Sequence, residues 1–220
     1  MTADQNIKRA RSDAQKAERQ AAILSAARDM IDEDGFDRVT MSALAKRAGL
    51  AKGTLYLYVR SKEELFLLLF VQAMERVVSR FKTETRPGSN AAQIAKGIAK
   101  QAQTTPLFLP MFARLVAMIE SNVADEPLFA AKRQMMVLSA EWATHLAHVT
   151  GVAPDRIEPL AHAIMMAMQG AAQFDLSSQR DPTDLPEDIR DAFSRYAFSP
   201  SFEPSARLLL EAAMAKAPSE

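Results

Sequence analysis

The segment 40–59 combines a helical pattern with side chains suited to nucleic-acid contacts. Its sequence is TMSALAKRAGLAKGTLYLYV. It predicts a helix over about residues 41–48, a glycine turn and a second short helix over about residues 52–59. Leu55 and Val59 lie four apart, so they share the buried side of the second helix. The opposite side presents lysine, threonine and tyrosine side chains, which suit contacts with phosphates and base edges.

Two helices joined in this way form the helix-turn-helix layout, in which the second helix enters the major groove of DNA. Gly49 permits the tight turn, and Gly53 allows the backbone to approach a phosphate closely. The free N–H groups at a helix N-terminus also attract phosphate. The alternative interpretation is ordinary packing of two helices in a bundle. It is disfavoured because many residue types fall at the spacing that the layout needs.

Short motifs at fixed spacing make residues 17–70 resemble the TetR family of transcriptional regulators. They are Asp34-Gly35-Phe36, Thr40, Leu44-Ala45, Ala48-Gly49-Leu50, Lys52-Gly53-Thr54-Leu55-Tyr56 and Ser61-Lys62-Glu63-Glu64-Leu65. The remainder resembles the family only in length, helical character and order of elements. Two positions depart from the family pattern. Ala51 stands where serine is common and removes a capping hydroxyl, and Val59 stands where phenylalanine is usual and predicts a looser seat for the second helix.

The resemblance implies a dimer that places one recognition helix per subunit in the major groove. Carried over by position, the expected DNA-binding residues are Thr40, Ser42, Lys52, Gly53, Thr54, Tyr56, Leu57, Tyr58 and Lys62. The hydroxyl groups of Thr40 and Ser42 and the ammonium group of Lys62 are expected to contact phosphates. The tyrosines are expected to pack on the DNA backbone or reach base edges, and Leu57 is expected to contact a thymine methyl group. The basic residues between positions 8 and 19 are expected to make weak phosphate contacts, after a solvated tail over residues 1–7.

Composition limits the other possibilities. The chain has 220 residues, 48% of them apolar, and no cysteine, which excludes disulfide scaffolds and thiol catalysis. Net charge is zero, yet residues 1–62 carry 12 basic against 8 acidic side chains, so the basic excess lies at the candidate DNA-binding end. No apolar run approaches the roughly 20 residues of a membrane span. Without a signal-peptide pattern, the expected compartment is the cytoplasm.

Helical periodicity continues to the end of the chain and predicts an all-α protein. Residues 1–62 form an expected basic arm and three-helix DNA-binding domain, and residues 63–220 an expected helical effector-binding and dimerisation domain. A helix over about residues 61–81 connects the two. The segment 180–204, rich in proline, is expected to be irregular around one short helix. The expected helices cover about residues 17–33, 41–48, 52–59, 61–81, 90–103, 107–121, 127–150, 155–177, 187–195 and 204–217.

The second domain is rich in methionine and aromatic residues, which suit an adaptable apolar pocket. The family resemblance implies a small-molecule site there, although a methionine stripe is also ordinary core. The candidate pocket residues are Phe108, Met111, Phe112, Met118, Met135, Trp142, Met165 and Met168. His145 and His148 have a spacing that metal pairs use, but no carboxylate completes a set, so no metal or other cofactor is expected.

The helix over residues 155–177 has small or apolar residues on two faces and therefore needs two burial partners. Its own core supplies one, and a second subunit is expected to supply the other, with help from the last helix. The candidate interface residues are Leu160, Ala163, Ala167, Gly170, Leu209, Leu210 and Ala213.

These patterns predict a dimeric, ligand-responsive DNA-binding regulator. The expected form is a repressor that a small, largely apolar effector releases from a palindromic operator. An activator or a corepressor-dependent regulator is the alternative. A helical-bundle enzyme and a protein-binding scaffold are remote alternatives. The sequence shows no nucleophile–base pair and no phosphate-cradling glycine loop, so no enzymatic activity is expected.

Overall fold

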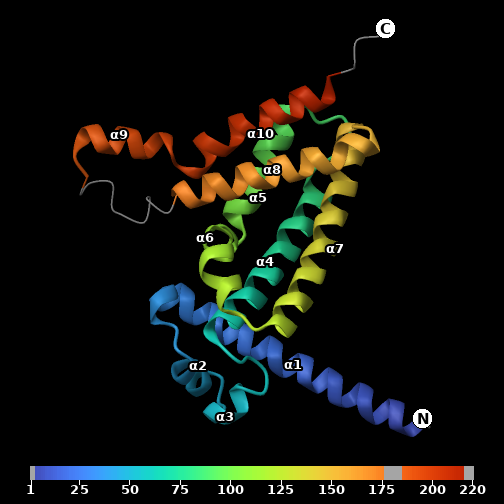
Figure 1. Ribbon diagram of the computed structural model, residues 1–220, viewed down its shortest axis with the longest axis vertical. Coiled ribbons are helices and arrows are strands. Elements are labelled where there is room, and N and C mark those ends of the chain that lie inside the picture. The colour runs from blue at the N-terminus through green and yellow to red at the C-terminus, as the bar shows by residue number, and fades with distance from the viewer. Residues whose placement is uncertain (1–2, 176–184, 216–220) are drawn as a thin grey trace. The chain divides into compact units, whose positions relative to one another are not determined.

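The computed structural model describes residues 3–175 and 185–215, with side chains for residues 15–116, 119–175, 185–191 and 194–215. All regular elements in these residues are helical, which confirms the predicted all-α class. No helix among them is long and apolar enough to cross a membrane. The α-helices (Figure 1) are α1 (Ala3–Asp34), α2 (Met41–Arg47), α3 (Lys52–Leu55), α4 (Lys62–Glu84), α5 (Ala91–Thr104), α6 (Phe108–Arg114), α7 (Asp125–Thr150), α8 (Pro154–Asp175), α9 (Glu187–Arg195) and α10 (Phe198–Met214).

The chain divides into two compact units. The N-terminal unit comprises residues 1–69 and 118–128, and the C-terminal unit comprises residues 70–117 and 129–220. Helix α4 begins in the first unit and ends in the second. The sequence-based division after residue 62 falls at the first residue of α4, whereas the compact N-terminal unit extends to Leu69.

The core of the N-terminal unit is made by apolar residues at helical spacing on α1 to α4. Ile23 and Ala27 of α1 lie one turn apart and are fully buried. Leu44 of α2, together with Leu55 and Val59, is also fully buried, as the spacing predicted. Each short helix therefore presents an apolar side to this core and leaves its other side to solvent.

Local caps fix where the helices of this unit begin and end. The Thr40 side chain accepts a hydrogen bond from the Ala43 N–H at 3.2 Å and caps α2. At the start of α4, the Ser61 hydroxyl accepts from the Glu64 N–H at 3.0 Å, and the Glu64 carboxylate accepts from the Arg60 N–H at 2.8 Å. This is the reciprocal arrangement of a capping box, with Glu64 reaching one residue further back than usual.

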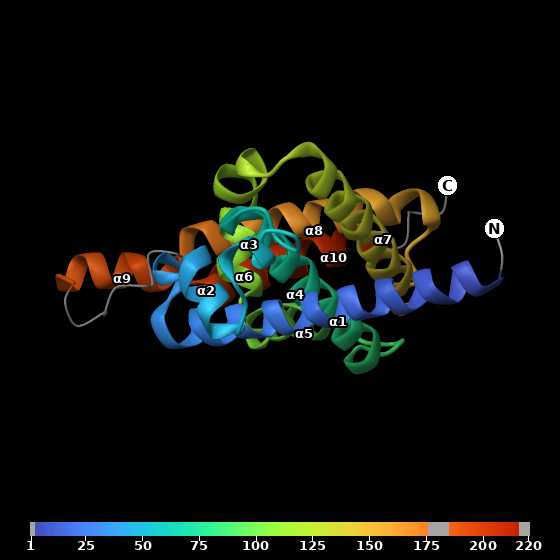
Figure 2. The same cartoon turned by 90° about the horizontal axis from the view of Figure 1, so that it is seen from below.

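In the C-terminal unit, α10 packs against both α8 and α5, and α6 packs against α8. Figures 1 and 2 both show α8 and α10 running side by side. Asn90 and Gln93 form a capping box at the start of α5. Phe198 and Phe202 on α10 are fully buried and stack with their ring centroids 5.2 Å apart.

Several predicted helix boundaries were wrong. Helix α1 begins at Ala3 rather than Ala17, because no glycine or proline interrupts the first 34 residues and their composition favours helix. Helix α10 begins at Phe198, inside the segment predicted to be irregular. Pro200 lies in its first turn, where N–H groups need no helical partner, and burial of two phenylalanines offsets the hydrogen bond lost at Pro204.

The predicted helices over residues 52–59 and 107–121 are also shorter than expected. Helix α3 ends at Leu55 and continues as turns. Helix α6 ends at Arg114, and a π-helical segment over Leu115–Ile119 and a 3-10 turn over Glu120–Asn122 follow it. Apolar periodicity alone does not separate a continuous α-helix from such a sequence of helical types, because each keeps an apolar face toward the core.

The burial of the Leu55 side chain on the core side of α3 can be tested by comparison with Leu57, which is 75% exposed. We expect Leu55→Ala to lower the free energy of unfolding by about 2–5 kcal/mol, since it leaves a cavity in a closed core. The matched change Leu57→Ala is expected to stay within about 0.5 kcal/mol of the parent protein. Urea denaturation followed by circular dichroism measures both, and equal effects would contradict this assignment of the buried side.

Candidate nucleic-acid interface

The turn between α2 and α3 depends on Gly49, whose φ of +66° lies in the left-handed region that favours glycine. The N–H of Gly49 donates to the Lys46 carbonyl at 3.2 Å, and the N–H of Leu50 donates to the Ala45 carbonyl at 2.9 Å. These bonds close α2 and redirect the chain within a few residues. Ala51 then begins α3 with no side-chain cap, as the departure from the family pattern predicted.

The structure leaves most of the predicted DNA-binding residues accessible on the N-terminal unit. Thr40, Ser42, Lys52, Gly53, Tyr56 and Leu57 are exposed, and Thr54, Tyr58 and Lys62 are half-buried. Tyr56 and Leu57 are 40% and 75% exposed, directly after Leu55, which is fully buried. The α3 segment therefore offers lysine, tyrosine and leucine side chains to a partner while its own apolar anchors stay in the core.

Two of the predicted phosphate-binding groups are positioned by neighbours. The Thr40 hydroxyl oxygen accepts the α2 capping bond, so its proton is still available for donation to a phosphate oxygen. The Lys62 ammonium lies 5.3 Å from the centre of the Phe66 ring, in a cation–π contact. Phe66 meets Phe36 edge-on at 5.6 Å, which holds this aromatic support in place.

Ion pairs connect the helices of the unit. Arg47 at the end of α2 makes a bidentate pair with the Glu33 carboxylate near the end of α1. The hydrogen bond from Arg47 lowers the pKa of Glu33, and the same bond raises the pKa of Arg47. Arg60 pairs with Glu126 at 2.9 Å. Neither pair could be predicted from the sequence, because the two partners of each are distant along the chain.

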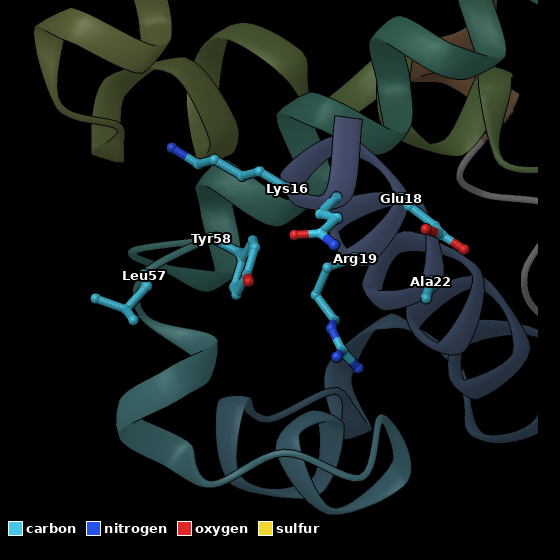
Figure 3. A pocket seen from close by; sticks show the side chains of 7 residues that line it. Lys16, Glu18, Arg19, Ala22, Leu57 and Tyr58 are labelled. Carbon is cyan, nitrogen blue, oxygen red and sulfur yellow. The ribbon is translucent and has the colours of Figure 1, made fainter. Parts of the chain in front are cut away.

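An open groove of about 880 Å³ lies between α1 and the turn that follows α3. Its walls are Gln15, Lys16, Glu18, Arg19 and Ala22 from α1, with Leu57 and Tyr58 from the other side. In Figure 3 the Arg19 side chain extends toward the α2–α3 part of the unit, and Tyr58 faces the groove from the opposite wall. The groove thus places two cations of the basic arm beside two predicted DNA-binding residues.

The remaining basic residues of the arm, Lys8, Arg9 and Arg11, lie outside the described side chains. The backbone of this part of α1 is helical, and both Figure 1 and Figure 2 show it projecting beyond α2 and α3. The candidate interface therefore has two parts, which are the exposed side of α3 and the groove against α1.

Comparison with known families agrees with this geometry. A family model described as bacterial regulatory proteins of the tetR family matches residues 23–69. A second model, described as the C-terminal domain of tetracyclin repressor-like proteins, matches residues 70–214, well over half of the chain. The chain belongs to the TetR family. DNA binding through the helix-turn-helix is the shared property of these transcriptional regulators.

Individual TetR-family relatives match over shorter stretches. The fatty acid metabolism regulator protein of Bacillus subtilis is 33% identical over 79 residues, which are 36% of this chain and 41% of that protein. The transcriptional repressor KstR of Rhodococcus jostii is 34% identical over 119 residues, 52% of this chain and 55% of that protein. The chain thus spans about half the length of these curated relatives.

Solved TetR-family structures share the fold over most of the chain. A TetR transcriptional regulator from Rhodococcus sp. RHA1 aligns with a TM-score of 0.57 and 21% identity, over 88% of this chain and 96% of that one. The fatty acid degradation regulator FadR of Bacillus halodurans aligns with a TM-score of 0.54 and 18% identity, over 86% and 97%. At these identities the likeness shows the fold.

The candidate effector residues of this TetR-family chain lie in the C-terminal unit, except Met118, which falls in the N-terminal unit. Phe108 and Phe112 on α6 each stack on Phe70 of α4 at 5.6 Å, and Met111 between them is fully buried. Met135 and Met168 are buried, Trp142 and Met165 are half-buried, and Trp142 packs on Phe81 at 5.4 Å. The side chain of Met118 lies outside the described residues.

The candidate dimer residues lie on α8 and α10, which pack together. Leu160 and Leu210 are buried within the single chain, whereas Ala163, Ala167, Gly170, Leu209 and Ala213 are half-buried. Sequence analysis missed the more exposed apolar residues nearby, Met166 and Phe174 on α8 and Leu208 on α10. The four-residue steps from Met166 through Gly170 to Phe174 are a signal that would have placed them on one face.

Proposed function

We propose that this chain is a homodimeric repressor that acts in the cytoplasm on a palindromic DNA operator. In this proposal a small, largely apolar effector releases it from that operator. The observation that carries the DNA-binding part is the two-sided α3 segment. Leu55 and Val59 anchor it in the core, while Lys52, Tyr56 and Leu57 remain exposed. Such a segment meets the requirement for reading base edges without loss of its own fold.

The groove between α1 and the α3 turn extends this DNA surface. Lys16 and Arg19 are exposed cations next to Leu57 and Tyr58. A DNA strand lying along the groove would place its phosphates within reach of both side chains, and phosphate neutralisation supplies much of the affinity for DNA. Glu18 opposes this attraction only in part, since it contributes a single negative charge.

Dimerisation is supported by the α8 and α10 surface. Small residues at Ala163, Ala167 and Gly170 allow close approach of another helix, and Met166 and Leu208 supply apolar area. Two copies of this surface around a two-fold axis would form a four-helix interface. The axis would also set the distance between the two recognition segments, which must match half-sites about 34–36 Å apart.

The effector response is proposed to act through α4, which continues without interruption from Lys62 to Glu84. Its first residue is a predicted phosphate contact, and Phe70 and Phe81 further along lie against the candidate effector residues. An effector that binds two arrangements of the C-terminal unit unequally shifts the equilibrium between them by that difference in affinity. Two relatives are fatty acid regulators, and Bacillus subtilis FadR has been determined in complex with stearoyl-CoA, which supports an apolar effector.

We expect the double change Lys52→Ala with Tyr56→Ala to weaken specific operator binding by about 100-fold or more, because base-edge and phosphate contacts are lost together. The operator is first obtained by selecting genomic fragments with the purified protein. Binding is then measured by fluorescence anisotropy, and sedimentation should show an unchanged dimer. The control Lys96→Ala with Phe129→Ala changes an exposed lysine and an exposed aromatic residue of the C-terminal unit. Specific binding retained by the Lys52 and Tyr56 variant would refute the site.

The contribution of the groove to DNA binding can be measured separately, through the salt dependence of the affinity. Lys16→Gln with Arg19→Gln is expected to weaken binding to all DNA sequences alike. It should reduce the slope of log affinity against log salt concentration by about 2, roughly 0.9 for each phosphate contact. Lys96→Gln with Arg133→Gln removes two exposed charges of the C-terminal unit and should leave the slope unchanged. An unchanged slope in the groove variant would show that DNA does not occupy the groove.

The proposed dimer surface is tested by a matched pair of substitutions that replace an alanine by arginine. Ala167→Arg places a charged side chain on the half-buried face of α8 and is expected to give a monomer in sedimentation velocity, because an unpaired charge at an apolar interface is costly. Ala140→Arg makes the same change on an exposed position of α7 and should keep the dimer. A stable dimer of the Ala167 variant would place the interface elsewhere.

A further inference from the structure

Gln101 is a buried polar residue in the C-terminal unit. The proposed DNA-binding surface gives this residue no role. It lies in the last turn of α5 and is only 1% exposed. Its side-chain oxygen, Oε1, is enclosed and has no hydrogen-bond partner among the residues that the structure describes. Buried side-chain acceptors in folded proteins almost always have a partner, so an exception calls for an explanation.

The next buried polar residue along the chain is already committed elsewhere. The Thr105 hydroxyl, one turn further on, donates its proton to the main-chain carbonyl of Gln101 at 2.7 Å. The Thr105 N–H donates to the same carbonyl at 3.1 Å. Both donors thus serve the backbone oxygen, and Oε1 of the side chain receives neither.

The other buried residues of α5 are all apolar. Within the described part of the C-terminal unit, the buried polar residues are Thr85, Gln101 and Thr105, all neutral. Ile94 and Ile98 share the buried side of α5 with Gln101 and are almost completely enclosed. A group that reaches Oε1 must therefore be neutral or leave its charge unpaired, which is expensive in such surroundings.

The same end of α5 leads into the most unusual backbone of the unit. Leu107 has a φ of +66°, the one non-glycine residue with positive φ in the described chain, and it precedes α6 without a side-chain cap. The other end of α6 passes into the π-helical segment Leu115–Ile119. Strained residues and π-helical turns cluster at functional sites, because the surrounding fold must hold them in place. Helix α6 is thus bounded by irregular backbone on both sides, and Gln101 precedes the first of these irregularities by six residues along the chain.

We propose that Gln101 recognises the polar end of the effector, and that this end is a neutral hydrogen-bond donor, a hydroxyl or N–H group, on an otherwise apolar molecule. The inference rests on the proposed function, in which the C-terminal unit binds an effector. The donor gives Gln101 Oε1 the hydrogen bond that it lacks within the described part of the chain. A carboxylate end is disfavoured, since it has no hydrogen to donate and would leave Oε1 without a partner. The bond would form in the last turn of α5, six residues before Leu107 with its positive φ.

The test uses the full-length protein and matched probes, namely primary alcohols from hexanol to hexadecanol with their methyl ethers and the corresponding carboxylates. Trp142, the only tryptophan, packs on Phe81 in the same unit and reports binding by its fluorescence. We expect the parent protein to bind an alcohol about five- to tenfold more tightly than the ether of equal length, from one net hydrogen bond. Carboxylates should bind more weakly than alcohols.

Gln101→Leu removes the acceptor and keeps the apolar volume, so alcohol and ether should then bind with similar affinity. Its melting temperature should be equal to or higher than that of the parent, because an unsatisfied buried group is removed. Gln103→Leu makes the same change at an exposed position of α5 and should retain the preference for alcohols. A preference retained in Gln101→Leu, a marked fall in its melting temperature, or no binding of any alcohol by the parent protein would overturn the proposal.

Operator binding without probe separates this proposal from the proposed function. Gln101→Leu and the parent protein should bind the operator equally, since Gln101 lies outside the N-terminal unit. A parent protein that binds its operator but shows no preference for alcohols contradicts the effector class alone. A parent protein that selects no operator contradicts the proposed function itself.

Discussion

The burial of Leu55 and Val59 is the interaction on which the DNA-binding surface depends. Helix α3 has only four helical residues, and a helix of that length has no stability of its own in water. Its shape is held because both side chains are completely enclosed by the core of the N-terminal unit. The exposed side is then free to carry Lys52, Tyr56 and Leu57, since none of them is needed for folding. Val59 is smaller than the family's usual phenylalanine, yet it is fully buried.

Charge placement complements this packing. The basic residues of the arm continue into α1, where Lys16 and Arg19 border the groove, while Arg47 is committed to Glu33. The unit thus distinguishes cations that stabilise its own helices from cations that remain available to a partner. The same distinction explains why a net charge of zero for the whole chain says little about its affinity for DNA.

The C-terminal unit is characterised by the apolar composition of its core. Its core is almost entirely apolar, with Phe70, Phe108 and Phe112 stacked together, and its buried polar residues among those described are the neutral Thr85, Gln101 and Thr105. Such a core suits the proposed apolar effector, and the unsatisfied Gln101 Oε1 within it is proposed to influence which molecule binds. The irregular backbone at both ends of α6 concentrates strain beside that core, where binding can act on it.

The sequence by itself determined the all-α class, the family, the helix-turn-helix and the exposed character of most of its predicted contact residues. These follow from local causes: apolar spacing, the glycine turn at Gly49 and the caps at Thr40 and Ser61. Only the tertiary structure decided the pairing of Glu33 with Arg47, the groove against α1, the start of α10 at Phe198 and the isolation of Gln101. Each of these features depends on contacts between residues far apart in the chain or on burial that outweighs local preference. Residue spacing along a single helix predicts neither such contacts nor such burial.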